Sequence, residues 1–395
     1  MGSRKPLTFL AVAALALAVA GDVLGADLPL VPGLRLSEIT IPSSMDGKDQ
    51  LVVIGVPEVY AEGKATALLV GLHTWSSDGR QMAGTYGNEA MKRGWLLVLP
   101  QFRGPMAGAT SDPREGGGSI LAQRDVMDAI AYMRAAYTVA PRRIYMVGAS
   151  GGGHMACLMA CKYPDVFAAV TAWCPITDLR EWYAQGDSYA ANIEAICGGK
   201  PGATPEVDFE YLRRSPRSFI TNAAGTHLLI GHGDRDETVY PEQSWNTFRE
   251  LRSLPQHGVV FDCWSGGHEA KTTEGLEWAS RWWLSTDPPS RLDLVTDEAK
   301  AYFWLHLTPS GPLTLGKCTA ILVRKGDALE PGKLAEATSL TLDTTDLAQV
   351  RVALKALNLR APEALPEGIT LEGGALVLRP GAGHRQFRVD LLAPQ

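Results

Sequence analysis

The chain has 395 residues, of which 46% are hydrophobic, and a net charge of −6 from 37 basic and 43 acidic side chains. This length exceeds that of one typical domain, and the apolar content is sufficient for a large core. The sequence has no basic stripe and no polybasic run, which argues against a nucleic-acid partner or a charged membrane surface.

The N-terminus has the pattern of a secretory signal peptide. Arg4 and Lys5 precede an apolar stretch over residues 7–20, and Ala18-Val19-Ala20 fits a small-residue cleavage site. The stretch is short for a membrane-spanning helix. We therefore predict a signal peptide at residues 1–20 and an exported protein, periplasmic or extracellular, with no membrane contact after signal removal. Cleavage after Ala26 and a retained N-terminal anchor are the alternatives.

Residues 27–286 alternate between apolar runs and helical stretches such as Ser119–Tyr137, which predicts an α/β domain with a doubly wound, mostly parallel sheet. One early run, Leu51–Ile54, is expected to be antiparallel. The other expected strands are Ala67–Leu72, Trp95–Leu99, Arg143–Val147, Phe167–Trp173, His227–Ile230 and Val259–Trp264. The segment at about residues 175–225 is too long for a simple crossover and predicts a small lid.

After residue 286 the pattern changes. Asp287-Pro288-Pro289-Ser290 is typical of a linker, and residues 290–395 predict a small β-rich, sandwich-like domain. Its expected strands are Tyr302–Leu305, Ala320–Val323, Leu340–Leu342, Val350–Val352 and Ala375–Leu378. Tyr302 or Trp304 could stack on a sugar if exposed, although aromatic residues inside a short strand more often belong to a core.

Gly148-Ala149-Ser150-Gly151-Gly152 matches the G-x-S-x-G pattern of a nucleophile elbow. It follows an expected strand and precedes an expected helix at residues 154–162. A serine on such a tight turn needs small neighbours, and the N–H groups that begin the helix can face a developing oxyanion. The pattern therefore predicts a serine nucleophile.

Two more motifs follow the ends of later strands. His232-Gly233-Asp234-Arg235-Asp236 follows one strand, and Gly266-Gly267-His268-Glu269 follows the next. Parallel strands place both segments at the same edge of the sheet. The chain order serine, acid, histidine is the order found in α/β-hydrolases. Asp234 and Asp236 are both candidates for the acid.

Together these motifs resemble the α/β-hydrolase superfamily, and within it the prolyl oligopeptidase-like catalytic domain and its esterase relatives. The resemblance covers roughly residues 50–285 and implies Ser150 as nucleophile, Asp236 as acid and His268 as base. It also implies an oxyanion hole formed by the Gly151 N–H and by a second N–H after the third strand. Many relatives carry His-Gly-Gly there, whereas this chain has His73-Thr74-Trp75, so Thr74 or Trp75 is the expected second donor.

Three residues are candidates for substrate binding: Trp75, His154 and Trp182. Each has a competing role, since Trp75 could pack under its own loop, His154 could cap its helix and Trp182 could lie on a solvated rim. His73 and His232 are expected to be structural.

The six cysteines are too few for a disulfide scaffold, although export permits disulfides. The i, i+4 pair Cys157 and Cys161 suits core positions on a helix. No Cys/His cluster has zinc spacing, so we expect neither a catalytic metal nor a cofactor.

The sequence therefore predicts an exported serine hydrolase that forms an acyl-enzyme. Fewer than about 30 mature residues precede the first expected strand, which leaves no room for the propeller that gates prolyl oligopeptidases. We therefore favour a carboxylic-ester hydrolase acting on small acyl esters or on acetyl- or feruloyl-decorated polysaccharides. A prolyl oligopeptidase-type serine peptidase or aminopeptidase is the alternative. A non-catalytic carbohydrate-binding protein with a relict hydrolase fold is a third reading. The sequence leaves the oligomeric state open.

Overall fold

The computed structural model describes residues 28–104, 112–186, 188–255, 258–330 and 333–394. The expected signal peptide lies outside these ranges. No helix in the described ranges is long and apolar enough to span a membrane.

The first of two large sheets has eight strands in the order β1-β2-β4-β3-β5-β6-β7-β8. β1 and β2 pair antiparallel, as do β2 and β4, and all later pairs are parallel. The strands are β1 (Leu34–Pro42), β2 (Asp49–Pro57), β3 (Thr66–Leu72), β4 (Leu96–Pro100), β5 (Val139–Ala149), β6 (Ala169–Trp173), β7 (His227–Gly233) and β8 (Gly258–Trp264). The expected doubly wound, mostly parallel sheet is confirmed.

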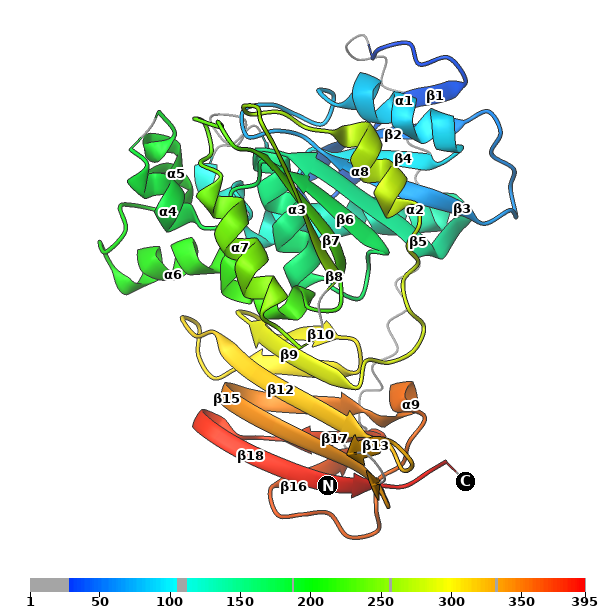
Figure 1. Cartoon of the computed structure of the whole chain (residues 1–395), viewed down its shortest axis with the longest axis vertical. Coiled ribbons are helices and arrows are strands. Elements are labelled where there is room, and N and C mark those ends of the chain that lie inside the picture. Colours follow the sequence, from blue (N-terminus) through cyan, green and yellow to red (C-terminus); the bar gives the residue numbers. More distant parts are fainter. Residues whose placement is uncertain (1–27, 105–111, 187, 256–257, 331–332, 395) are drawn as a thin grey trace, which may run out of the picture.

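Helices cover both faces of this sheet (Figure 1). The alternation of side chains along the strands divides the core, so that Leu68 and Val70 of β3 face one cluster and Leu69 faces the other. The first cluster includes residues of α2 (Ile120–Ala136), α3 (Gly151–Lys162) and α7 (Glu242–Arg252). The second includes residues of α1 (Ala83–Arg93) and α8 (Thr272–Ala279). Ser119 caps α2 by accepting a hydrogen bond from the N–H of Ala122, as its position before the helix suggests.

The expected lid segment between β6 and β7 consists of short helices. They are α4 (Leu179–Ala184), α5 (Ala190–Cys197), α6 (Pro205–Arg213) and the 3-10 helix η2 (Pro216–Ala223). Another 3-10 helix, η1 (Pro113–Glu115), precedes α2 and contacts α5. The lid therefore packs against the loop that leads into α2.

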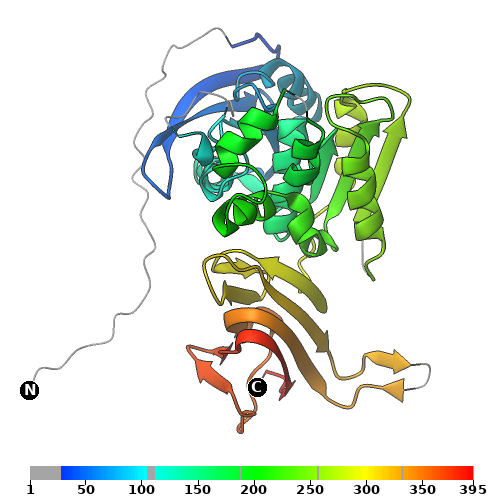
Figure 2. The same ribbon diagram turned by 90° about the vertical axis from the view of Figure 1, so that its left-hand side faces the viewer.

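The second sheet is antiparallel and confirms the expected β-rich C-terminal region. Its elements are β9 (Arg291–Thr296), β10 (Lys300–Tyr302), β11 (Leu305–Pro309), β12 (Gly316–Val323), β15 (Thr338–Ala353), α9 (Leu354–Leu357), β16 (Ile369–Glu372), β17 (Ala375–Leu378) and β18 (Gly381–Leu391). A small hairpin of β13 (Ala328–Glu330) and β14 (Lys333–Leu334) projects from the sheet (Figure 2).

One strand prediction in this region was wrong, and two other predicted strands belong to a single strand. Tyr302–Leu305 is not one strand, because Phe303 has φ 51° and turns the chain between β10 and β11. The predicted strands at 340–342 and 350–352 are parts of one long strand, β15, in which Asp346 has φ 54° at a register shift. Tyr302 and Trp304 are buried in the core of this sheet, so neither ring can stack on a sugar.

The six cysteines all lie in the described ranges and all are free thiols. Cys157 and Cys161 are buried in the core on α3, as predicted from their spacing.

Buried polar contacts join the second sheet to α3, α6 and η2. Lys162, the last residue of α3, forms a 2.7 Å ion pair with Asp297, and neither side chain is exposed. Arg213 of α6 contacts the same carboxylate at 2.9 Å. The Asn222 side chain donates to the Val295 carbonyl at 2.9 Å and accepts from its N–H at 2.7 Å, as a neighbouring strand would. The interface therefore links the nucleophile-bearing region, the lid and the second sheet.

Replacing Asp297 with Asn should strongly destabilise the protein, because Lys162 and Arg213 would lose the carboxylate that pairs with both of them in a buried site. We expect a loss of about 3 to 5 kcal/mol in the free energy of unfolding, measured by urea denaturation at pH 7. Asp390→Asn is the matched control, because its ion pair with Arg388 is exposed and 3.8 Å long. It should cost less than about 1 kcal/mol.

The stability lost in Asp297→Asn should depend on pH. Burial opposes ionisation of Asp297, but Lys162 and Arg213 outweigh it and lower its pKa. The stabilisation is therefore complete above the unfolded-state pKa of about 3.9 and is lost as the pH falls through the folded-state value. The difference in free energy of unfolding between wild type and Asp297→Asn should therefore become smaller in acid. Equal stability of the two proteins at pH 7 would contradict this account.

Candidate active site

Ser150 occupies a strained turn between β5 and α3. Its backbone has φ 57° and ψ −121°, a conformation that is costly for a residue with a side chain. Two hydrogen bonds of 2.8 Å hold it, one from Ser150 N–H to the Trp173 carbonyl and one from His154 N–H to the Ser150 carbonyl. The turn has the geometry expected of a nucleophile elbow at the carboxyl end of a central strand.

Glycines permit the close approach of backbone on both sides of this serine. A Cβ on Gly148 would lie 2.2 Å from the Gly152 carbonyl oxygen, and one on Gly151 would lie 2.5 Å from the Trp75 nitrogen. Neither position has room for a side chain. The second contact also shows that the Trp75 amide lies beside the first residue of α3.

The Thr74 and Trp75 N–H groups, the two candidates for the second oxyanion donor, differ in whether another acceptor already binds them. The Thr74 N–H donates to Gln81 Oε1 at 2.9 Å, so this amide is already engaged. The Trp75 N–H makes no hydrogen bond within the described parts of the chain, and it lies next to Gly151. The geometry therefore favours Trp75 over Thr74 as the partner of Gly151.

His73 holds the loop that carries this amide. Its Nδ1 lies 2.8 Å from the Thr74 carbonyl and its Nε2 lies 2.6 Å from the Gln101 carbonyl, while its ring stacks on Phe102. Burial lowers the pKa of His73, although the two carbonyls oppose this shift. The residue is structural, as expected.

Asp236 and His268 form a hydrogen-bonded pair. His268 Nδ1 donates to Asp236 Oδ2 at 2.6 Å, and the N–H groups of Thr238 and Val239 donate to Oδ1 at 2.9 and 3.0 Å. Burial opposes ionisation of Asp236, but hydrogen bonds from His232, His268 and Val239 outweigh it and hold its pKa well below the usual range. The proton on Nδ1 leaves His268 Nε2 free to act as a base.

The competing acid, Asp234, lies in a different environment. Its carboxylate is exposed, accepts from the Gly266 N–H at 3.1 Å and pairs with Arg235 at 3.7 Å. Among the hydrogen bonds of the described residues, none joins it to His268. The geometry therefore agrees with the assignment of Asp236.

Ser150 and His268 line one cavity of about 380 Å³. Its remaining wall comes from loops at the carboxyl edge of the sheet and from the lid: Thr74–Ser76, Ala149, Cys174, Tyr189, Thr238 and Glu269–Ala270. The described contacts include no direct hydrogen bond between Ser150 and His268, and such bonds often tighten only when substrate binds. The cavity therefore brings the expected nucleophile and base together.

Two of the three substrate-binding candidates lie elsewhere. His154 is fully buried, its Nε2 lies 2.7 Å from the Arg214 carbonyl, and burial lowers its pKa to about 4. Trp182 is also buried. It donates to the Thr238 carbonyl at 3.2 Å and packs edge-on against Trp75, so it connects the lid to the loop that follows Asp236. Of the three candidates, Trp75 alone lines the cavity. Tyr189, which stacks on Trp182, also lines it and was not among the candidates.

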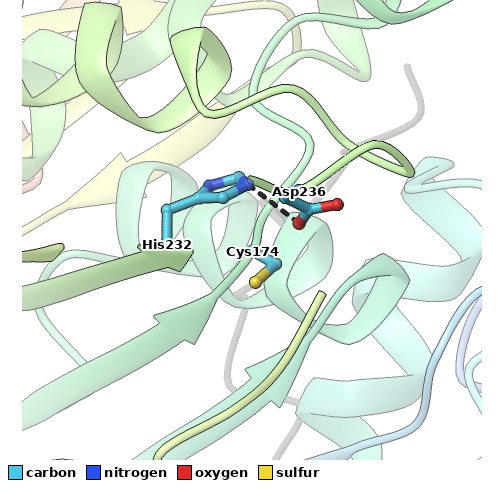
Figure 3. Close-up of side chains that lie close together, drawn as sticks. All are labelled: Cys174, His232 and Asp236. Atoms are coloured by element: carbon cyan, nitrogen blue, oxygen red, sulfur yellow. Dashed lines mark hydrogen bonds and ion pairs between the residues drawn. The ribbon is translucent and has the colours of Figure 1, made fainter. Parts of the chain in front are cut away.

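Cys174, His232 and Asp236 form a buried cluster (Figure 3). Their potential metal-ligand atoms lie within 4.8 Å of one another. His232 Nε2, however, lies 2.8 Å from the Val239 carbonyl and must carry a proton to bond it, so it has no lone pair to offer a metal. Burial, and then the charge of Asp236, raise the pKa of the Cys174 thiol to about 12. The cluster is a hydrogen-bond network rather than a metal site.

Residues 121–273 match the model of the prolyl oligopeptidase family. The resemblance to that family is confirmed. The chain is 25% identical over 162 residues to the uncharacterized peptidase YtmA of Bacillus subtilis, covering 41% of this chain and 60% of that protein. It is 21% identical over 207 residues to acetylxylan esterase A of Talaromyces purpureogenus, covering 51% and 52%.

A solved structure agrees in fold. Prolyl oligopeptidase B from Galerina marginata superposes with a TM-score of 0.51 at 19% identity, covering 63% of this chain and 36% of that protein. The first sheet and its helices therefore form an α/β-hydrolase fold. The chain spans 60% or less of the length of these relatives, and the relatives include both peptidases and esterases. Residues 121–273 therefore resemble a family whose relatives hydrolyse either peptides or esters by name.

Sequence reasoning did not assign Tyr189, Thr238 or Cys174 to the cavity. Cys174 follows β6 at the carboxyl edge of the sheet, where active-site residues gather, and this position could have singled it out. Tyr189 and Thr238 carried no such signal, because their place depends on how the lid packs.

Asp236→Asn should lower kcat by about 10⁴-fold, because an amide cannot hold His268 in the required tautomer. Asp234→Asn makes the same chemical change on an exposed carboxylate that bonds Gly266 and Arg235 instead of His268, and should leave kcat near that of wild type. Steady-state kinetics on an activated ester measures both. A larger loss in Asp234→Asn would reverse the assignment of the acid.

Proposed function

We propose that the protein is a serine hydrolase that cleaves carboxylic esters through an acyl-enzyme. One observation carries the proposal: a cavity contains both a serine on a strained strand–helix turn and a histidine bonded to a buried, ionised aspartate. Ser150, Asp236 and His268 are the proposed triad.

In the first half of the reaction, His268 Nε2 takes the proton of Ser150 as Oγ bonds to the ester carbonyl carbon. The carbonyl oxygen becomes negatively charged and accepts hydrogen bonds from the Gly151 and Trp75 N–H groups. The C–O bond to the leaving alcohol then breaks, and the alcohol takes the proton from His268. The acyl group remains on Ser150.

In the second half, His268 takes a proton from water, and the water oxygen bonds to the acyl carbon. The second tetrahedral intermediate collapses by breaking its bond to Ser150 Oγ, which recovers its proton from His268. The carboxylic acid leaves and the free enzyme is restored. Asp236 stays ionised and stabilises the imidazolium in both halves.

The similarity to acetylxylan esterases supports an ester substrate. Small side chains of Ser76, Ala149 and Ala270 lie around the cavity, and among the described residues no Lys or Arg lines it. We therefore propose a neutral acyl group, either on a small ester or on an ester-decorated polysaccharide. We also propose, from residues 1–20 of the sequence, that the protein is exported.

A serine peptidase or aminopeptidase is the second candidate. The match to the prolyl oligopeptidase family and the exposed Glu269 carboxylate, which lines the cavity beside His268, favour it. A carboxylate in this place suits the ammonium group of a peptide amino terminus.

A paired assay separates the two candidates. We expect p-nitrophenyl acetate and butyrate to be hydrolysed and Ala-Pro and Gly-Pro p-nitroanilides to be left intact. Ser150→Ala should reduce ester turnover by about 10⁶-fold, as loss of a triad nucleophile does. Ser253→Ala, a change of the same kind on an exposed residue after α7, is the control and should retain turnover.

Turnover of the anilides at a rate equal to the esters would make the peptidase the better description. Wild-type turnover in Ser150→Ala would remove Ser150 from the mechanism and refute the proposal as a whole.

A further inference from the structure

A second histidine contacts the acid of the proposed triad. His232, the sixth residue of β7, is fully buried, and its Nε2 lies 3.1 Å from Asp236 Oδ2, the same oxygen that accepts from His268. Figure 3 shows the ring aimed at this carboxylate. The triad mechanism described above gives His232 no part.

The partners of His232 determine which of its nitrogens is protonated. Nε2 faces two acceptors, the Asp236 carboxylate and the Val239 carbonyl at 2.8 Å, and therefore carries the proton. Nδ1 lies 2.6 Å from Ser244 Oγ on α7, so it accepts the hydroxyl proton. Ser244 thus orients the ring so that its Nε2–H is directed at the acid.

We infer that His232 is a positioning residue of the reaction, whose Nε2–H holds Asp236 in the orientation that His268 requires. The inference rests on the proposed function and extends it to a fourth side chain. The carboxylate then receives four donors: His268 and His232 on Oδ2, and the Thr238 and Val239 N–H groups on Oδ1. With these donors in place the carboxylate cannot rotate without breaking hydrogen bonds in a buried site.

The extra donor also has an electrostatic consequence. A hydrogen bond from His232 draws part of the carboxylate charge away from His268. When that donor is lost, more of the charge acts on His268, and the protonated imidazolium becomes more stable. Protonated His268 cannot accept the Ser150 proton, so the acid limb of the activity profile should move to higher pH.

The other titratable groups around Asp236 and His268 should not move the acid limb of the activity profile. Cys174, from the end of β6, donates its thiol to the Glu269 carbonyl at 3.0 Å, and its raised pKa keeps it neutral over the assay range. The exposed carboxylate of Glu269 lies on the loop that carries His268, and Asp234 and its partner Arg235 lie exposed on the loop that carries Asp236. All of these remain in place in the variants that follow.

The test is a set of variants assayed on p-nitrophenyl acetate over the range pH 5 to 9. His232→Phe removes the donor and should lower kcat by about 10- to 100-fold with little change in KM. The midpoint of the acid limb of kcat/KM should rise by about half a pH unit. His232→Gln, whose amide nitrogen can occupy the place of Nε2, should restore most of both quantities.

Ser244→Ala keeps His232 but removes the hydroxyl that fixes its tautomer. It should lower kcat by about threefold and move the acid limb in the same direction. It decides the question if His232→Phe fails to fold. His384, which bonds Asp343 at 2.7 Å on the surface of the second sheet, offers matched controls, and His384→Phe and His384→Gln should leave the profile unchanged.

The result that overturns the inference is a folded His232→Phe with the wild-type kcat and acid limb or, where that variant does not fold, an unchanged Ser244→Ala. Equal losses in His232→Phe and His232→Gln, with no movement of the acid limb, would show a packing role only and would also overturn it. Ser150→Ala is assayed in parallel. Turnover that persists in it refutes the proposed function itself, so the two failures are distinguishable.

Discussion

The active site depends on one strained residue. Ser150 has a left-handed backbone that a residue with a side chain adopts only when its surroundings enforce it. The enforcing contacts are the parallel pairing of β5 with β6, the full burial of α3, and glycines at positions where a Cβ would collide with backbone. The same crowding brings the Trp75 amide to the start of α3. A site for an oxyanion is therefore formed by the contacts that hold the serine in its strained conformation.

A buried negative charge imposes the second constraint. A carboxylate removed from water is costly unless hydrogen bonds replace its hydration. Asp236 meets this requirement with donors from its own loop, from β7 and from the loop after β8. The ends of two adjacent strands must therefore keep their register for the charge to be tolerated. The hydrogen bonds that stabilise the ionised acid are also those that fix the direction in which it meets His268.

The sequence predicted the parts of the site that local patterns encode. Ser150, Asp236 and His268 each follow a strand in a short motif, and parallel pairing brings strand ends together whatever the lid does. The engagement of the Thr74 amide by Gln81, and the burial of Trp182, were not predictable, because they depend on packing between segments far apart in the chain. For the fold, the alternation of apolar runs with helical stretches predicted the first sheet. Strand limits in the second were missed where single residues with positive φ bend the chain.

Helix α3 connects the active site to the second sheet, because its two ends lie in different environments. Its first residue, Gly151, follows the nucleophile and faces the Trp75 amide, whereas its last, Lys162, is paired with Asp297 from the second sheet. Asp297 also binds Arg213 of the lid helix α6. A shift of the second sheet would separate a buried charge from both partners, at a cost of several kcal/mol. The C-terminal region therefore restrains the nucleophile helix and the lid together, although none of its described residues lines the cavity.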